Sequence, residues 1–401
     1  MSRHRTVQLL ALVLPTLAGC ITPPNTDDLS CACEQPDLEG IQQDVDNLAA
    51  LDIEGRLAAL EALGAEDRLS ELEARFIQQD VVLAVPAEYP SIQAALAALD
   101  GRGIASTATA TIQVAPGDYT VDPVIRIQHP NGDRIHITGD ADSPADVRLV
   151  CPAGCVEVSD GHTLGLIEGM TLVGAGGDYG LVARNNGTLT ASAVRTSDFG
   201  AGYGALDGGV LFADGTEDEG SWYSYHSGMS AALHADGATS TNPQHYGFIA
   251  ERSAYMNANN SRVSGAGRDG YLQTGAYLDA EKALATDCDV GFRSNGPGEL
   301  NVHAARSVNA TSYGFTSQYG GLIVLSSRAG EEASAEGSGL VGVMVDGPGL
   351  VWVGDYTTIS GSGVVDLQAH YGGMIRTESA AFGSMDPSGW ADPYDGASIW
   401  R

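Results

Sequence analysis

The spacing of apolar residues predicts two different structures along this chain. Between residues 38 and 77, apolar residues recur at steps of three and four, in one stripe that begins at Leu38 and a second that runs from Ile53 to Phe76. This is the spacing of one helix face, so a helical stalk is expected over residues 38–80. Gly55 and Gly64 weaken it as a coiled coil. A stalk that folds back on its own chain and a stalk that joins several chains both remain open.

After residue 81 the helical period gives way to short strands. Residues 84–96 predict a strand, a turn and a short helix with Ser91 as its N-cap and with Ile92, Ala95 and Leu99 on its apolar face. Further strands are expected over residues 111–114, 124–127 and 134–137, because turns rich in Gly, Pro and Asp separate them. A sheet structure therefore follows the stalk.

A glycine followed by a strand-forming segment then recurs about every 23 residues, a period typical of solenoids. One turn of a solenoid cannot bury its apolar face alone, whereas stacked turns share a continuous core. We expect these glycines at the corners, where backbone angles forbidden to other residues are needed. The repeat is marked by Gly180, Gly204, Gly228, Gly247, Gly270, Gly291, Gly314, Gly342 and Gly363.

Residues 86–96 (PAEYPSIQAAL) and 112–119 (IQVAPGDY) resemble the opening of the pectin lyase-like superfamily, and residues 166–172 continue the pattern. In that family a helix caps the start of a right-handed parallel β-helix. The resemblance is sharp over residues 82–175 and rests on periodicity beyond them. It implies an all-β fold, with a parallel β-helix over residues 81–385 and a C-terminal tail over 386–401.

The N-terminus has the features of an export signal. Arg3 and Arg5 precede an apolar run over residues 7–17 that is too short to span a bilayer, and Ala18 and Gly19 precede Cys20. This arrangement resembles the lipobox of bacterial lipoproteins. The resemblance implies a signal peptide over residues 1–19, lipidation of Cys20, a tether over 20–37 and a membrane anchor, with the outer membrane or cell surface favoured. An ordinary signal peptide with an incidental Cys20 is the alternative.

Composition and cysteine spacing narrow the possible partners. With 51 acidic and 20 basic residues the net charge is −31, which disfavours nucleic acid. An anionic polysaccharide would need a local basic patch or a bridging cation such as Ca²⁺.

Cys151 and Cys155 flank a tight Pro-Ala-Gly turn and are the candidate disulfide, since export permits one. No histidine or second cysteine pair lies at zinc-ligand spacing, so neither a metal site nor a cofactor is expected.

The sequence assigns no catalytic residue. Motifs similar to those of pectin methylesterases, pectate lyases and polygalacturonases are absent from the expected solenoid. Asp287 and Asp289 would share one face of a strand, with Cys288 pointing inward, and a solvated outer face is favoured over an acid–base pair or a Ca²⁺ site.

The densest aromatic group contains Trp222, Tyr223, Tyr225 and His226, with His245 and Tyr246 about one turn later. It predicts a glycan-binding patch, with a turn that covers the core as the alternative.

Three functions are consistent with these features. The favoured one is a membrane-anchored surface protein for adhesion or glycan recognition. A surface polysaccharide lyase or glycoside hydrolase is the second, and an assembly component similar to a phage tail spike, in which the stalk joins three chains, is the third. Both a monomer and a homotrimer remain open.

Overall fold

The computed structural model describes residues 75–386 and 396–400, together with residues 39–40, 42–43, 46, 53–62, 68, 70, 71 and 73. The chain divides into two compact units, residues 1–70 and 71–401. Within the predicted stalk the first unit contains helix α2 (Ile53–Ala62). Cys20, Cys31, Cys33 and the signal peptide lie outside the described residues. In the described part of the chain, no helix combines the length and apolar character needed to cross a membrane.

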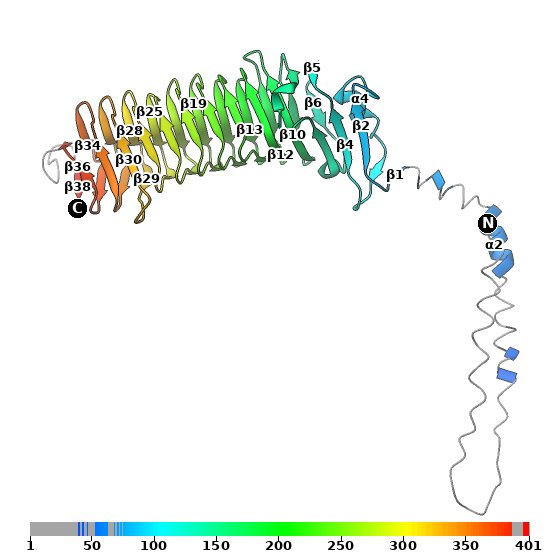
Figure 1. The fold of residues 1–401 in the computed structure, drawn as a ribbon. Helices are drawn as coiled ribbons and strands as arrows, with labels where there is room; N and C mark the ends of the chain where they lie inside the picture. The colour runs from blue at the N-terminus through cyan, green and yellow to red at the C-terminus, as the bar shows by residue number, and fades with distance from the viewer. Residues whose placement is uncertain are drawn as a thin grey trace, which may run out of the picture. The chain divides into compact units, whose positions relative to one another are not determined.

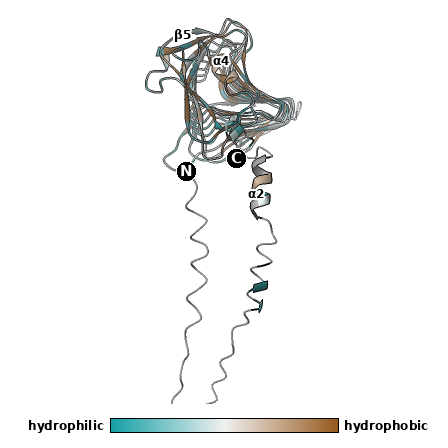
Figure 2. Ribbon diagram, turned by 90° about the vertical axis from the view of Figure 1, so that its right-hand side faces the viewer, coloured by the Kyte–Doolittle hydropathy of each residue, from teal (hydrophilic) through white to brown (hydrophobic). Residues whose placement is uncertain are grey.

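The second unit is a parallel β-solenoid of about 14 turns, as the sequence predicts (Figure 1). Each full turn contributes one strand to each of three sheets, and every strand pairs in parallel with its equivalents in the neighbouring turns. Figure 2 views this unit end-on, with the sheets surrounding a common interior. The long strands β10 and β12 run through both the first and the second sheet.

The first sheet consists of β2 (Val81–Val85), β4 (Ala110–Val114), β7 (Ile135–Thr138), β10 (Thr163–Val173), β12 (Thr188–Ser197), β14 (Val210–Phe212), β17 (Ala232–His234), β20 (Tyr255–Asn257), β23 (Tyr277–Asp279), β26 (Gly298–Asn301), β29 (Gly321–Leu325), β32 (Leu350–Val353), β35 (Met374–Thr377) and β38 (Ser398–Trp400). The second sheet consists of the later parts of β10 and β12 with β5 (Gly117–Thr120), β8 (Val147–Val150), β15 (Glu217–Glu219), β18 (Thr239–Thr241), β21 (Arg262–Ser264), β24 (Leu284–Thr286), β27 (Arg306–Val308), β30 (Ala333–Glu336), β33 (Thr357–Ser360) and β36 (Ala381–Phe382). The third sheet consists of β6 (Ile125–Ile127), β9 (Val156–Val158), β11 (Tyr179–Ala183), β13 (Ala201–Leu206), β16 (Tyr223–Gly228), β19 (Tyr246–Glu251), β22 (Asp269–Thr274), β25 (Val290–Asn295), β28 (Tyr313–Gln318), β31 (Val341–Asp346), β34 (Val365–His370) and β37 (Met385–Asp386).

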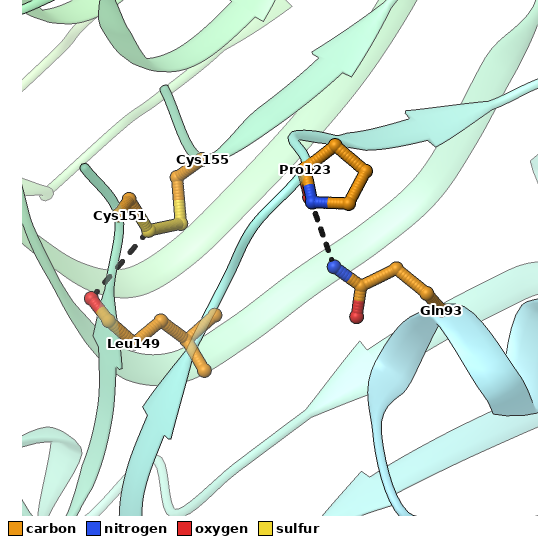
Figure 3. Close-up of a disulfide and its surroundings, with 5 residues drawn as sticks. All are labelled: Gln93, Pro123, Leu149, Cys151 and Cys155. Atoms are coloured by element: carbon orange, nitrogen blue, oxygen red, sulfur yellow. Dashed lines mark hydrogen bonds between the residues drawn. A yellow bond between two sulfur atoms is a disulfide. The ribbon is translucent and has the colours of Figure 1, made fainter. Parts of the chain in front are cut away.

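Helix α4 (Ile92–Ala97) lies at the N-terminal end of the solenoid (Figure 1). As predicted, Ser91 is its N-cap, with the side chain accepting a hydrogen bond from the backbone N–H of Ala94 at 3.1 Å. The side chain of Gln93 donates to the carbonyl oxygen of Pro123 at 3.0 Å and ties the helix to the next turn (Figure 3). Figure 3 also shows the disulfide between Cys151 and Cys155, both buried.

Strand pairing extends beyond both ends of the predicted solenoid range. Strand β1 (Phe76–Ile77), inside the predicted stalk, pairs with β3 (Gly103–Ile104). Strand β38, inside the predicted tail, pairs with β35. Short 3-10 turns, η1 (Gly132–Arg134) and η2 (Pro144–Asp146), precede β7 and β8. Strand β38 thus extends the first sheet, whereas β1 and β3 form a separate two-stranded sheet.

Six aromatic side chains form a continuous stack inside the third sheet. Neighbouring ring centroids are 4.6 to 4.9 Å apart and the rings are nearly parallel, which matches the spacing of adjacent strands. The buried hydroxyl groups of the tyrosines find hydrogen-bond partners, such as the carbonyl oxygen of Val194 for Tyr203 at 2.8 Å. The stack consists of Tyr203, Tyr225, Phe248, Tyr271, Phe292 and Phe315.

The repeating glycines serve close packing, and none of them adopts the positive φ expected at the corners. A Cβ on Gly247 would lie 2.5 Å from Cγ2 of Val263 in the second sheet and 2.7 Å from the carbonyl oxygen of Gly270. Register also corrects the predicted series, because Gly204 aligns with Val182, Gly228 with Leu206, and Gly363 precedes β34. The residues that align in successive turns are Gly180, Gly202, Ser224, Gly247, Gly270, Gly291, Gly314, Gly342 and Asp366.

Candidate functional site

The structure separates the four predicted glycan-binding residues. Trp222 precedes β16 and is 42% exposed, Tyr223 is half-buried on the outer face of the third sheet, and His226 is nine-tenths buried there. Tyr225 is fully buried in the internal aromatic stack, so it is not available to a ligand and the prediction for this residue is corrected. We call Trp222, Tyr223, His226, His245 and Tyr246 the aromatic patch.

The two faces of the Trp222 indole have different surroundings. One face stacks on the ring of His245, with 3.7 Å between centroids. In the preceding turn the residue aligned with Trp222 is Gly200, which has no side chain to cover the other face, and one turn further back it is Asp178. Gly200 is partly exposed and Asp178 is exposed. Trp222 is therefore 42% exposed, with His245 on one ring face and no aligned side chain in the preceding turn.

Tyr223 and Tyr246 form a second stacked pair, with 5.4 Å between ring centroids. Trp222 meets Tyr223 edge to face, so the two pairs form one continuous surface. The guanidinium of Arg268 lies 5.3 Å from the centroid of the Tyr246 ring. This cation covers one end of the aromatic patch.

A half-buried polar network supports the patch from behind. The hydroxyl of Tyr179 lies 3.1 Å from Nδ1 of His226, and Nε2 of His226 lies 3.5 Å from a carboxylate oxygen of Glu251. The latter distance is too long for a good hydrogen bond. Burial raises the pKa of Tyr179 to about 12, whereas the neighbouring His226 ring lowers the pKa of Glu251.

Most charged groups around the patch are already paired. Asp269, 1% exposed at its side chain, receives two hydrogen bonds from Arg293, at 3.0 and 3.1 Å. Burial raises the pKa of the Asp269 carboxyl, although Arg293 opposes the shift. Glu251 contacts Arg252 at 3.6 Å. The described part of the structure contains no ion-pair partner for Asp178 or Arg268.

The acidic pair considered in the sequence lies at a corner of the solenoid. Asp287 is exposed and accepts a hydrogen bond from Asn309, while Asp289 accepts from Thr311 and Ser312. Cys288 between them is buried, as expected. Within the described residues, no group of three or more His, Cys, Asp or Glu side chains has an arrangement that would hold a metal ion.

A second aromatic column, which the sequence analysis did not single out, lies on the outer face of the first sheet. Phe212 stacks on His234 at 4.8 Å, and Tyr255 stacks on Tyr277 at 5.7 Å. His234 and Tyr255 are tilted at 53° with 5.8 Å between centroids, so the four rings form one column along this sheet. Its signal in the sequence is the spacing of 21 to 22 residues between its rings.

Comparison with known proteins shows similarity in fold alone. No family model matches the sequence, and no curated protein is similar to it. Solved catalytic domains of a GH87 alpha-1,3-glucanase share the β-helix architecture. One variant in complex with nigerose has a TM-score of 0.47 at 11% sequence identity, covering 80% of this chain and 68% of that chain. The unsubstituted domain with nigerose has a TM-score of 0.46 at 12% identity over the same shares.

Proposed function

We propose that this protein recognises a glycan, and that a sugar ring packs on the open face of Trp222. The observation that carries this proposal is the asymmetry of the indole, with His245 behind one face and Gly200 opposite the other. The C–H groups on one side of a pyranose form an apolar surface that packs on such a ring, while its hydroxyl groups remain available for hydrogen bonds. Asp178, aligned two turns before Trp222, offers an acceptor for those hydroxyl groups.

Trp222 is not needed to complete the core, which supports a role in binding. The aromatic stack inside the third sheet is fully buried without it, and 42% of Trp222 faces solvent. Each 100 Å² of apolar surface left in water costs about 2.5 kcal/mol relative to its burial. An exposed indole held against His245 and Tyr223 is therefore expected where a ligand covers it.

Binding fits the carboxylates of the patch better than hydrolysis does. Most glycoside hydrolases need two carboxyl groups, one on each side of the scissile bond. Asp269 is held by Arg293, and Glu251 lies between His226 and Arg252. Asp178 has an exposed carboxylate with no ion-pair partner among the described residues. Display on a membrane through lipidated Cys20 would place this surface toward external polysaccharides.

The test is binding to a panel of polysaccharides that includes dextran, an α-1,3-glucan, alginate and polygalacturonate. Affinity electrophoresis should show retardation by at least one of them, and Trp222→Ala should weaken it about tenfold, equivalent to about 1.4 kcal/mol. Trp352→Ala is the matched control, because Trp352 is 39% exposed and lies on the first sheet. Equal binding by Trp222→Ala and wild type would refute the site.

The same mixtures should be assayed for new reducing ends and unsaturated products. No turnover is expected, because Asp269 is held by Arg293 and Glu251 lies between His226 and Arg252. Turnover that Asp178→Asn abolishes would replace recognition with hydrolysis or elimination as the function.

A further inference from the structure

We propose that the glycan is anionic and that Arg268 binds its carboxylate or sulfate group. This inference rests on the proposed function and specifies its ligand. Arg268 is exposed and covers the Tyr246 ring, and in the described part of the structure no carboxylate lies within ion-pair distance of its guanidinium. A guanidinium offers paired N–H donors that match the oxygens of a carboxylate or sulfate.

Arg268 belongs to the same column of aligned residues as Trp222. Successive turns place Gly200, Trp222, His245 and Arg268 at equivalent positions. Three turns separate Gly200 from Arg268, which corresponds to about 14 Å along the solenoid axis. A short oligosaccharide lying along this axis can place one ring against Trp222 and an acidic substituent of a later ring at Arg268.

The other charges around Arg268 are directed elsewhere. Asp289 aligns with Arg268 in the following turn, but one of its oxygens accepts hydrogen bonds from Thr311 at 2.9 Å and Ser312 at 2.5 Å. Asp269 is held by Arg293. The field of Arg268 reaches the patch, since it lowers the pKa of His245 in addition to the larger effect of burial.

Because the chain has a net charge of −31, an unpaired arginine on its surface determines where an acidic polymer can bind. An acidic polymer is repelled by most of such a surface and can settle only where a cation is left unpaired. Arg252 and Arg293, the neighbouring cations on this face, both contact carboxylates. On this face an anionic glycan is therefore expected to bind along the column from Gly200 to Arg268.

The experiment compares Arg268→Gln with Arg262→Gln in the full-length protein. Arg262 is also exposed and also lacks an ion-pair partner among the described residues, but it lies on β21 of the second sheet. Affinity electrophoresis and calorimetry would use polygalacturonate as the carboxylated probe, dextran sulfate as the sulfated probe and dextran as the neutral one. Arg268→Gln should weaken binding of at least one charged probe about tenfold, and high salt should reduce the difference. The probe that loses affinity identifies the group.

Three outcomes would overturn the inference. If Arg262→Gln weakens binding as much as Arg268→Gln, the attraction is not local. If Trp222→Ala abolishes binding while Arg268→Gln leaves it unchanged, the proposed function stands and the anionic ligand is wrong. If dextran binds as tightly as both charged probes, charge is not recognised. If the proposed function itself were wrong, neither Trp222→Ala nor Arg268→Gln would affect binding.

Discussion

Replacing Asp218 with asparagine should stabilise the solenoid at neutral pH. Asp218, in β15, is 2% exposed and points into the interior between the second and third sheets. One carboxylate oxygen accepts hydrogen bonds from Thr196 at 2.7 Å and Ser221 at 2.6 Å, and the other lies 2.6 Å from the hydroxyl of Ser224. Among the described residues no cation forms an ion pair with it, so its charge is balanced by hydrogen bonds alone.

The magnitude follows from the pKa of this carboxyl. Burial raises the pKa of Asp218 from 3.8 to about 6, with the three hydroxyl groups opposing the shift. The folded state therefore holds a proton between about pH 4 and pH 6 that the unfolded chain has released, so stability falls as the pH rises through this window. At 1.36 kcal/mol for each pKa unit, the ionised carboxylate destabilises the fold by about 3 kcal/mol at pH 7.

Asparagine removes this charge and preserves the hydrogen bonds. Its oxygen can accept from Thr196 and Ser221, and its amide can donate to Ser224, whose hydroxyl lies 2.7 Å from that of Ser240. Urea denaturation of wild type and Asp218→Asn should give similar free energies of unfolding near pH 4 and a more stable variant near pH 7.5. Comparing wild type and variant at the same pH cancels the contribution of the other carboxylates to the free energy of unfolding. A variant that is less stable than wild type at the higher pH would refute the argument.

Three further changes test the core, the glycines and the anchor. Phe292→Ala should lower the free energy of unfolding by about 3–5 kcal/mol in urea titrations, because its fully buried ring stacks between Tyr271 and Phe315; a loss below about 1 kcal/mol would contradict the stacked core. Gly247→Ala should cost about 1–3 kcal/mol through its approach to Val263, whereas the control Gly177→Ala, 3.3 Å from the nearest atom, should cost less; equal losses would disprove the packing role. Under the lipobox interpretation Cys20→Ser should release the protein from membranes, since the thiol would carry the acyl chains; retention after a carbonate wash would rule that interpretation out.

Local signals in the sequence predict much of the fold. The N-cap at Ser91 depends on neighbouring residues alone, and the Cys151–Cys155 disulfide spans one tight turn. The strand expected over residues 134–137 is observed as β7, one residue later at each end. Such features are predictable because the residues that cause them are close in the chain, and the period of about 23 residues adds the stacking of turns.

The glycine series predicted from the sequence differs from the series that aligns in the structure. The aligned positions are set by contacts between sheets, which spacing along the chain does not reveal. Where the second and third sheets approach closely there is little room for a side chain, and most turns place glycine there. Other residues can also occupy this position. In the turn of β16 the aligned residue is Ser224, which hydrogen-bonds to Asp218 across the same junction. The chain contains 52 glycines, several of them in each turn, so spacing alone selects Gly204 and Gly228 as readily as Gly202.

Tyr225 shows why the direction of a side chain could not be predicted. Strict alternation would place Tyr223 and Tyr225 on the same side of β16. In the structure Tyr223 lies on the outer face, whereas Ser224 and Tyr225 are consecutive and both fully buried. Alternation fails here because the strand passes a corner, where Ser224 faces Asp218 in the second sheet and Tyr225 joins the aromatic stack.

Binding surfaces of a solenoid are difficult to predict from its sequence. Perfect repetition stacks like on like, so an aromatic ring is covered by the rings of the adjacent turns, as Phe248 and Tyr271 are inside the third sheet. A ring face becomes available to a ligand only where the repetition is interrupted. Gly200 interrupts it in front of Trp222. Periodicity therefore predicts the core, where the turns agree, and gives no information on a turn whose difference leaves a ring such as Trp222 exposed.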